Sequence, residues 1–159
     1  MTCQWLIHAS DRGVTAIRLK RDGAGRKKNG GARCQRLCAG AAWELSAYFA
    51  GRLTAFSSPY DIHALPPFAR AVLKMTAKIP YGEVRSYEWI ARKLGNAKAA
   101  RAVGNALARN PIPIIVPCHR VVRTDGAIGG FALGAGWKKR LLNLEKTFVK
   151  TKTSPMKRA

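Results

Sequence analysis

The sequence predicts an α+β fold, in which a small N-terminal antiparallel sheet with a helix precedes a mostly helical C-terminal domain with a winged-helix-like helix-turn-helix. Three observations predict it. Two short apolar segments flank a turn near the N-terminus, helix signals become dense in the second half, and a glycine turn separates two of those helices. With 159 residues and 47% hydrophobic content, the chain can bury a sizeable core as one domain or as two small domains that share an interface.

The N-terminal half predicts a hairpin, a loop and one helix. Apolar segments at 6–9 and 14–19 enclose a Ser-Asp-Arg-Gly turn, which is the composition of a β-hairpin. Residues 20–36 are dominated by Gly, Lys and Arg, so we expect a mobile basic loop there. Aromatic and aliphatic residues that precede Gly51 then predict a helix over 41–50.

The second half predicts helices in close succession. Apolar spacing indicates a helix over 68–79, and Ser86 can cap a second helix that runs to Leu94. The turn Gly95-Asn96 leads into a third helix over 97–108, and a closing helix is expected over 137–146. Helix, short glycine turn and helix is the arrangement of a helix-turn-helix.

An irregular stretch at 54–67, which contains three prolines, marks the expected boundary between two domains. We therefore expect an N-terminal α/β domain at 1–63, which includes the basic loop 20–36. A C-terminal domain is expected at 64–147, followed by a basic tail at 148–159.

The charge balance is strongly one-sided, with 29 Lys and Arg against 8 Asp and Glu and a net charge of +21. Such a balance disfavours the compact state through self-repulsion, and it is usually tolerated because the partner is a polyanion. Nucleic acid is the first candidate partner, since a basic surface that only aids solubility does not account for the imbalance.

A polar stripe follows the predicted helix over 97–108. Lys98, Arg101, Asn105 and Arg109 succeed one another at steps of three, four and four. Such a stripe is commonly a solvated face, but here alanine and glycine crowd the rest of the helix and permit close approach to a nucleic-acid groove. Arg101 stands above this smooth surface, where a long side chain can enter a base stack or replace an extruded base.

Cys118 lies between Pro117 and His119 within an apolar stretch, which predicts a nucleophile in a dry and rigid setting. His119 can move a proton, and Arg120 adds positive charge that favours thiolate over thiol. A Cys-His pair taken alone fits a buried structural cysteine equally well, because free cysteine is among the most buried residue types. The motifs on either side decide between the two interpretations.

The sequence contains no run of about eighteen apolar residues and no secretory leader. We therefore expect a soluble intracellular protein without a membrane partner, cytoplasmic or nucleoid-associated, or nuclear in a eukaryote. It is expected to be a monomer.

The four cysteines are expected to be reduced thiols, because their spacing is uneven and no secretion signal is present. Zinc bound by Cys34 and Cys38 with Cys3, His8 or His63 is an alternative. Their spacing is not that of a zinc finger or ribbon, so we expect no metal and no cofactor.

Four motifs, in order, resemble those of the O6-alkylguanine-DNA alkyltransferases, which are suicide DNA-repair methyltransferases. They are Tyr81-Gly82-Glu83-Val84-Arg85-Ser86-Tyr87, Ala99-Ala100-Arg101-Ala102-Val103-Gly104, Asn110-Pro111 and Pro117-Cys118-His119-Arg120-Val121-Val122. The resemblance is close over 68–145 and looser over the first half. By comparison with typical members, the chain is expected to start late, without part of the first strand.

The resemblance implies that Cys118 takes the alkyl group from a flipped base and keeps it as a thioether. The substrate would be mainly O6-methylguanine, with O4-methylthymine as a second substrate, and the activity that of a single-turnover methylated-DNA–protein-cysteine methyltransferase. The C-terminal domain would then bind DNA and accept the alkyl group. By the same analogy, Glu145 orients His119, which draws the proton of Cys118 through a water and lowers the pKa of the thiol.

The resemblance also assigns expected roles around the nucleophile. Tyr87 donates its phenolic hydrogen to the departing guanine, and Asn110 ties the recognition helix to the cysteine segment. Arg101 fills the gap that the flipped nucleotide leaves in double-stranded DNA, approached through the minor groove. The expected DNA contacts are Arg101, Ala99, Ala100, Ala102, Gly104, Lys98, Asn105, Ser86 and Thr124. The expected alkyl pocket is lined by Leu107, Pro113, Val121, Phe131, Ala132 and Leu133.

This chain departs from the family pattern at two pocket positions. Many members have tyrosine where this chain has Phe131, and glycine where it has Leu133. We therefore expect a narrower pocket that repairs methyl adducts faster than benzyl adducts. The basic loop and tail are further departures, and they predict salt-sensitive DNA binding.

Two other functions stay open at this point. A non-enzymatic helix-turn-helix DNA-binding or damage-sensing protein would bind DNA and transfer nothing, but such sensors lack the nucleophile that Cys118 supplies. A Cys-His hydrolase would have no use for the alanine-lined helix and Arg101.

Overall fold

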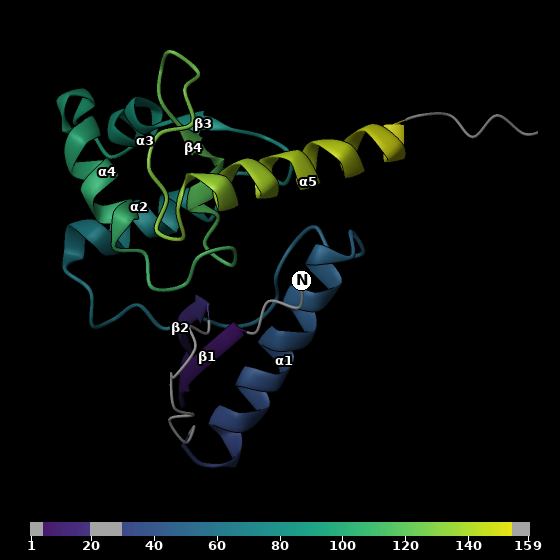
Figure 1. Cartoon of the computed structure of the whole chain (residues 1–159). Helices are drawn as coiled ribbons and strands as arrows, with labels where there is room; N and C mark the ends of the chain where they lie inside the picture. Colours follow the sequence, from purple (N-terminus) through teal and green to yellow (C-terminus); the bar gives the residue numbers. More distant parts are fainter. Residues whose placement is uncertain (1–4, 20–29, 154–159) are drawn as a thin grey trace, which may run out of the picture.

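The computed structural model describes residues 5–19 and 30–153 of the chain. Within these residues a hairpin and one long helix precede a helical assembly that includes a second, very short sheet (Figure 1). The elements are β1 (Trp5–Ser10), β2 (Gly13–Leu19), α1 (Ala32–Phe49), α2 (Pro67–Thr76), β3 (Arg85–Ser86), α3 (Tyr87–Lys93), η1 (Ala97–Ala99), α4 (Ala100–Ala108), η2 (Cys118–Arg120), β4 (Val121–Val122) and α5 (Ala135–Thr153). The predicted α+β fold class is confirmed.

The predicted hairpin is confirmed, with β1 and β2 antiparallel and Ile7 opposite Ile17. Helix α1 packs against it, and the side chain of Leu45 is 1% exposed there. Full burial of a leucine side chain stabilises a fold by about 1.5–3 kcal/mol. The hairpin and α1 therefore form the hydrophobic core of the N-terminal half.

Helix α1 begins at Ala32, so the helix expected over 41–50 was predicted too short, and the loop expected over 20–36 is wrong for its last residues. The reason is a buried stripe that the basic composition conceals. Cys34 and Cys38 lie one turn apart and face the hairpin, which extends the apolar side of α1 toward its N-terminus. Residues 20–29 of the expected loop lie outside the described residues.

The predicted helix-turn-helix is present as α3, a glycine turn and α4. The Ser86 side chain accepts a hydrogen bond from the Trp89 main-chain nitrogen at 3.0 Å and caps α3 as expected. Asn96 caps the turn η1 in the same way, so α4 proper begins at Ala100. Strand β3, just before α3, pairs in parallel with β4, just after the cysteine turn. This pairing ties the helix-turn-helix to the segment of Cys118.

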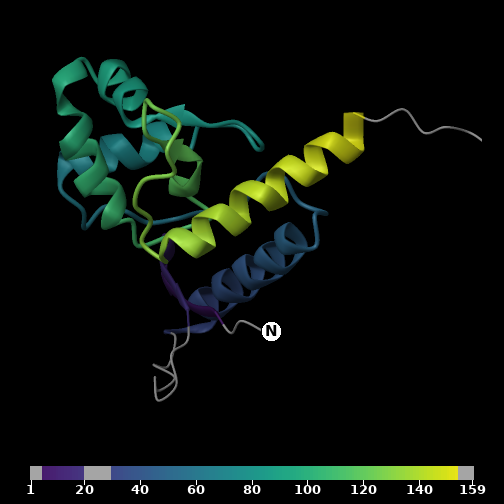
Figure 2. The same cartoon turned by 45° about the horizontal axis from the view of Figure 1, so that its top comes forward.

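Helix α5 continues well beyond the closing helix expected over 137–146 and reaches Thr153. The expected tail at 148–159 is therefore helical in its first part, and residues 154–159 lie outside the described residues. Turned by 45°, the structure shows α1 and α5 running beside each other (Figure 2). The rings of Phe49 in α1 and Trp137 in α5 meet edge to face.

A single apolar core runs from the hairpin through α1 to the cysteine segment and α5. The division into domains at residues 63 and 64 stays a prediction. Among the described residues, none of the helices has the length and apolar character needed to span a bilayer.

Candidate active site

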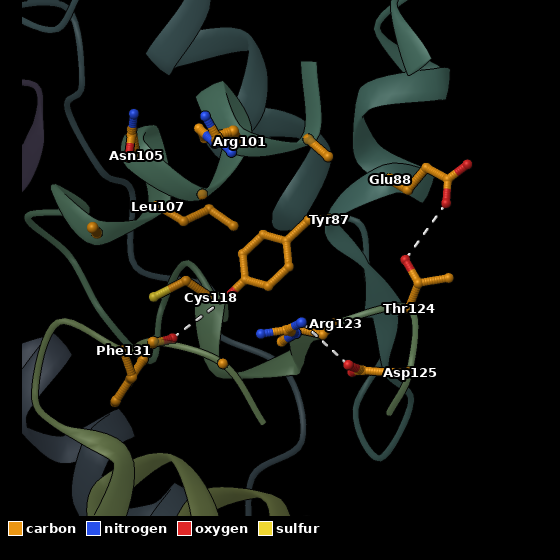
Figure 3. Close-up of a pocket in the computed structure, with 15 residues that line it drawn as sticks. Tyr87, Glu88, Arg101, Asn105, Leu107, Cys118, Arg123, Thr124, Asp125 and Phe131 are labelled. Atoms are coloured by element: carbon orange, nitrogen blue, oxygen red, sulfur yellow. Dashed lines mark hydrogen bonds and ion pairs between the residues drawn. The ribbon is translucent and has the colours of Figure 1, made fainter. Parts of the chain in front are cut away.

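Cys118 lies in the short turn η2 at the edge of a cavity of about 730 Å³, and its side chain is buried, with 3% exposed. The cavity opens between α4 on one side and the segments after β4 on the other (Figure 3). It is lined by Tyr87, Glu88, Ala100, Arg101, Gly104, Asn105, Leu107, Ala108, Cys118, Arg123, Thr124, Asp125, Gly129, Gly130 and Phe131. The expected nucleophile and the expected recognition helix thus meet at one pocket.

Asn110 holds the cysteine segment in place. Its Nδ2 donates to the main-chain oxygen of Val116 at 3.0 Å and lies 3.1 Å from Sγ of Cys118, while its Oδ1 accepts from the nitrogen of Ile112 at 3.0 Å. Between these contacts Ile114 has φ 79°, a conformation that β-branched residues rarely adopt. The segment is therefore held by its contacts, with Asn110 at their centre, and not by local preference.

The pKa of Cys118 is raised to about 11, chiefly because burial disfavours the thiolate. The hydrogen bond from Asn110 and the charge of Lys138 oppose this effect but do not overcome it. The expected lowering of the thiol pKa is therefore wrong for the structure without DNA. Arg120, the expected source of positive charge, directs its guanidinium to Glu145 instead.

His119 is fully buried behind the cysteine, and its Nε2 lies 2.9 Å from Oε1 of Glu145. A proton on Nε2 is directed at this carboxylate, which leaves Nδ1 as the acceptor of the ring. Among the described residues Nδ1 has no hydrogen-bond partner. Burial lowers the pKa of His119, and Glu145 opposes that shift. The imidazole is therefore neutral and has one vacant acceptor.

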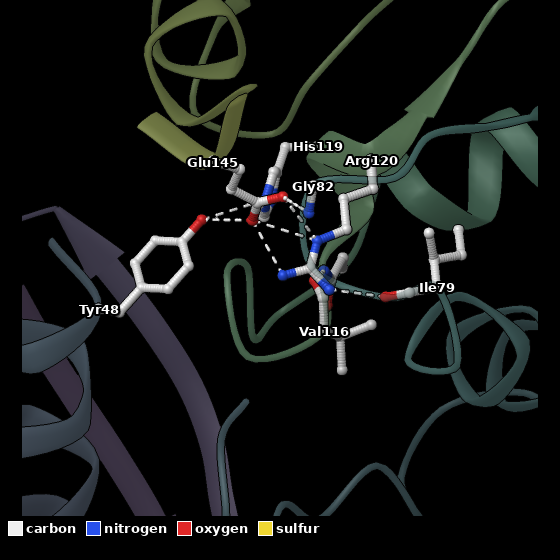
Figure 4. A network of polar contacts seen from close by, with 8 residues as sticks. Tyr48, Ile79, Gly82, Val116, His119, Arg120 and Glu145 are labelled. Atoms are coloured by element: carbon white, nitrogen blue, oxygen red, sulfur yellow. Dashed lines mark hydrogen bonds and ion pairs between the residues drawn. The ribbon is translucent and has the colours of Figure 1, made fainter. Parts of the chain in front are cut away.

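Glu145 is the centre of a polar network that joins three parts of the chain (Figure 4). The Tyr48 hydroxyl donates to Oε1 at 2.6 Å, and the Gly82 nitrogen donates to Oε2 at 3.0 Å. Arg120 donates from Nε and Nη2, and its Nη1 donates to the oxygen of Ile79 at 2.6 Å. Burial raises the pKa of the carboxyl, but the bonds from His119 and Arg120 outweigh burial and lower it to about 2.

Lys138 is a fully buried cation on the other side of the cysteine turn. Its Nζ donates to the oxygens of Val121 at 2.5 Å and Gly130 at 3.0 Å, and it lies 3.4 Å from the Tyr87 hydroxyl. Burial lowers the pKa of Lys138 to about 8. The lysine thus links the nucleophile segment, the glycine loop and the pocket tyrosine.

Sequence reasoning missed three members of this site: Tyr48, Arg120 as a partner of Glu145, and Lys138. For Lys138 a signal existed, because Lys138, Leu141 and Glu145 recur at helical spacing and form the buried face of α5. Tyr48 carries no such signal, since its hydroxyl meets Glu145 only through the tertiary fold.

The expected DNA-contacting residues divide into two groups. Those that line the cavity are Arg101, Asn105, Ala100, Gly104 and Thr124. Those that do not are Lys98, Ala99, Ala102 and Ser86, of which Lys98 and Ala99 belong to the turn η1 before α4. The side chains of Arg101, Asn105 and Arg109 are exposed, as the predicted polar stripe requires, while Val103 and Leu107 are buried.

The expected alkyl pocket is only partly matched. Leu107 and Phe131 line the cavity, whereas Pro113, Val121, Ala132 and Leu133 are not among its lining residues and stay predictions as pocket residues. Pro113 and Val121 are enclosed in the core, and the Val121 oxygen is occupied by Lys138. Leu133 is not among the lining residues, so the narrower pocket expected from it stays a prediction.

The surroundings of Cys34 and Cys38 give little support to the alternative of a zinc site. Cys34 Sγ lies 3.5 Å from a carboxylate oxygen of Asp11, and Cys38 Sγ lies 3.4 Å from the main-chain oxygen of Ile7. Within 5–19 and 30–153, His, Cys, Asp and Glu side chains form no group of three or more that could hold a metal ion. Cys3 lies outside the described residues.

Comparison with known proteins adds a family and several relatives. The family model described as "6-O-methylguanine DNA methyltransferase, DNA binding domain" matches residues 67–147. A "Methylated-DNA--protein-cysteine methyltransferase" of Mycobacterium tuberculosis (strain ATCC 25618 / H37Rv) is 49% identical over 108 residues, which are 68% of this chain and 65% of the relative. A protein of the same name from Methanosarcina acetivorans is 49% identical over 105 residues, 64% of this chain and 65% of the relative. These matches thus span just under two thirds of the relatives' length.

Two solved structures share the fold. The M. tuberculosis OGT in complex with DNA gives a TM-score of 0.79 at 38% identity and covers 91% of this chain and 87% of its own. An O6-methylguanine DNA methyltransferase from Methanococcus jannaschii gives 0.65 at 28% identity and covers 89% of this chain and 87% of its own. The similarity therefore includes the N-terminal half as well as the helix-turn-helix.

Proposed function

Because the chain belongs to the 6-O-methylguanine DNA methyltransferase family, we propose that it repairs DNA by moving an alkyl group from O6 of guanine irreversibly onto Cys118. O6-methylguanine is the main substrate, and O4-methylthymine is the second. One observation carries the proposal: Sγ of Cys118 faces the cavity beside α4, while His119 presents a vacant Nδ1 from the buried side of the same turn.

The reaction is a displacement at the alkyl carbon. Sγ of Cys118 forms the new S–C bond as the C–O6 bond breaks, and the electron pair of that bond stays with the guanine oxygen. The thiol proton passes through a water to Nδ1 of His119, and Glu145 balances the imidazolium that results. The thioether is stable, so each protein molecule reacts once.

The high thiol pKa suits this single use. A buried thiol with a pKa of about 11 is largely protonated at neutral pH and therefore reacts slowly with stray electrophiles. His119 is neutral in the same environment, so it can take the proton when a substrate is in place. Activation then depends on the bound base and not on a permanent thiolate.

Tyr87 and Lys138 act on the departing base. Lys138 lies 3.4 Å from the Tyr87 hydroxyl oxygen and can donate to it, while the phenolic hydrogen donates to the main-chain oxygen of Gly130 at 3.4 Å. Tyr87 lines the cavity, and turning this hydrogen from Gly130 to the bound guanine would stabilise the negative charge that develops there. The protein needs no metal or cofactor for these steps.

Helix α4 is the proposed DNA-reading element. Its small residues Ala100, Gly104 and Ala108 line the cavity and allow a close approach to the minor groove of a duplex. Arg101 is exposed beside them and fills the gap left by the flipped nucleotide. Lys98, Asn105, Ser86 and Thr124 contact the surrounding DNA, with Ala99 and Ala102 beside them, and the protein works as a monomer on chromosomal DNA.

The test is single-turnover repair of a duplex that contains one O6-methylguanine. The proposal predicts that guanine is restored in proportion to added protein, up to one equivalent, and that Cys118→Ser restores none. The alternative function is that of a damage-sensing protein. Such a protein would bind the duplex and restore no guanine, either as the unmodified chain or as Cys118→Ser. Repeated turnover would contradict the irreversible scheme.

A further inference from the structure

Beyond Glu145, the next turn of α5 makes two unusually close contacts. The ring of Phe148 lies against Gly51, where an added Cβ would come within 2.0 Å of its Cζ. The Cγ2 of Val149 lies against Gly82, where an added Cβ would come within 2.5 Å. Only glycine leaves room for either side chain.

Both glycines are also required by their backbone. Gly51 has φ +70° and Gly82 has φ +79°, in the left-handed region that other residues rarely adopt. Gly51 follows the C-terminus of α1 and donates to the oxygen of Tyr48 at 2.9 Å. The contacts of Phe148 and Val149 are therefore made to backbone that is itself fixed.

The two segments that receive these side chains also donate hydrogen bonds to Glu145, in addition to those from the cysteine turn. Tyr48, three residues before Gly51, donates to Oε1, and Gly82 itself donates to Oε2. Phe148 and Val149 follow Glu145 at positions i+3 and i+4, so the three share one face of α5. The contacts that Tyr48 and Gly82 make with the carboxylate are thus each paired with an apolar contact one turn later on α5.

This pairing bears on how accurately the carboxylate is placed. A helix that slips by one residue moves about 1.5 Å and turns about 100°, which would break the bonds from both Tyr48 and Gly82. A hydrogen bond weakens steeply with such changes of geometry. Two apolar contacts fitted against bare backbone oppose both the slip and the rotation.

We propose that Phe148 and Val149 are positioning residues, which fix α5 so that Glu145 meets His119 and thereby set the basicity of the proton acceptor. The inference rests on the alkyl transfer proposed above. Phe148 and Val149 are not among the residues that line the cavity, and they lie beyond the residues that the family model matches.

Several charged or titratable groups face His119 and share in its titration. They are Glu145 and Lys138 of α5, Tyr48 of α1, and Arg120 and Cys118 of its own turn. Of these groups, Glu145 raises the pKa of His119. Arg120 and Lys138 lower the pKa of His119. A displaced Glu145 therefore leaves a weaker base, with a lower His119 pKa.

The test compares Phe148→Ala with the unmodified chain under single-turnover conditions and saturating damaged duplex, across the pH range. We expect transfer to slow by about 3- to 10-fold, a fraction of what a general base contributes, with the acid limb of the profile moved to lower pH. The Kd for undamaged duplex stays unchanged, because α4 lies on a different part of the molecule (Figure 1). Phe148→Leu, which keeps apolar bulk, restores most of the rate.

Lys146→Ala is the matched control, since Lys146 lies on the same turn with its side chain exposed, and it should leave rate and profile unchanged. A second pair of variants tests the fit from the other side. Gly82→Ala should slow transfer, and adding Val149→Ala should recover part of the loss by making room for the new methyl group. A double variant slower than Gly82→Ala alone would contradict the proposed fit.

A readout without DNA separates this inference from the proposed function. The His119 ring nitrogens, followed by NMR during an acid titration, should show a lower pKa in Phe148→Ala than in the unmodified chain. An unchanged His119 pKa together with an unchanged rate would overturn the inference. Absence of transfer by the unmodified chain would overturn the proposed function, while the NMR comparison would still decide whether Phe148 positions Glu145.

Discussion

Asn110 places its Nδ2 3.1 Å from Sγ of Cys118, so the residue that follows the C-cap of the recognition helix directly contacts the nucleophile. The same nitrogen donates to Val116, and the Asn110 Oδ1 accepts from Ile112. One buried amide thus forms hydrogen bonds with main-chain groups of the bend before the cysteine. The same amide also opposes the rise of the Cys118 pKa that burial causes. One side chain therefore contributes both to the position of the thiol and to its pKa.

Asn110→Ala should destabilise the fold and slow transfer together. The substitution leaves the buried Ile112 nitrogen without the partner it has in Asn110, at a cost of about 1–3 kcal/mol. It also removes one of the two hydrogen bonds to the Val116 oxygen, which keeps the bond from the Cys118 nitrogen. Urea unfolding measures the loss, and Asn105→Ala serves as the control for stability because that amide is exposed on α4. An Asn110→Ala protein as stable as the unmodified one would refute this role.

The thiol of Cys118 should titrate far above neutral pH in the absence of DNA. Alkylation of its peptide by iodoacetamide, followed by mass spectrometry, should rise with pH to a midpoint near 11, compared with a pKa of 9.0 for an unperturbed cysteine thiol. Burial is the cause, so mild unfolding should move the midpoint down. A midpoint below about 8, the range of cysteines activated by a permanent thiolate, would contradict the account.

Glu145 should make the fold sensitive to acid. Its pKa is lowered from 4.5 to about 2, so its contribution to stability is fully present above pH 4.5 and is lost as the pH falls toward 2. The shift corresponds to about 3 kcal/mol by linkage. Glu145→Gln should therefore show a shallower fall in unfolding free energy between pH 4.5 and 2, and an equally steep fall would exclude Glu145 as the source.

Arg101→Ala should impair repair of duplex DNA far more than reaction with a free base. We expect a loss on the order of 10- to 100-fold in transfer from duplex, because filling the gap offsets an unstacking cost of a few kcal/mol. Transfer from free O6-benzylguanine should be nearly unchanged.

Arg109→Ala is the matched control for this prediction, because Arg109 belongs to the same exposed stripe but does not line the cavity. Loss of the Arg109 charge should weaken DNA binding only through electrostatics, so the affinity of the variant should depend less on salt than that of the unmodified chain. Equal losses of transfer rate from duplex DNA in both variants would contradict a gap-filling role of Arg101 and leave only the effect of its charge.

The elements with local signatures could be predicted from the sequence. The hairpin follows from apolar segments around a turn, and α3 with its Ser86 cap and glycine turn follows from residues within a few positions of each other. The start of α1 could not, because Cys34 and Cys38 read as part of a basic loop until the hairpin they face is known.

The site was predicted in its parts but not in its electrostatics. Cys118, His119, Glu145 and Asn110 all meet in the structure, whereas Lys138 looked like one of 29 cations in the sequence. Its burial comes from the packing of α5 over β4 and the glycine loop. The direction of the thiol shift was wrong for the same reason, since burial outweighs the charges that a linear sequence displays.

The most direct test of the account maps the product. The protein is incubated with one equivalent of a duplex containing O6-methylguanine, digested, and its peptides are weighed by mass spectrometry. We predict a single added methyl group on the peptide that contains Cys118, with Cys34 and Cys38 unmodified. A bound duplex with no adduct, or a methyl group on any other residue, would contradict the assignment of Cys118 as the acceptor.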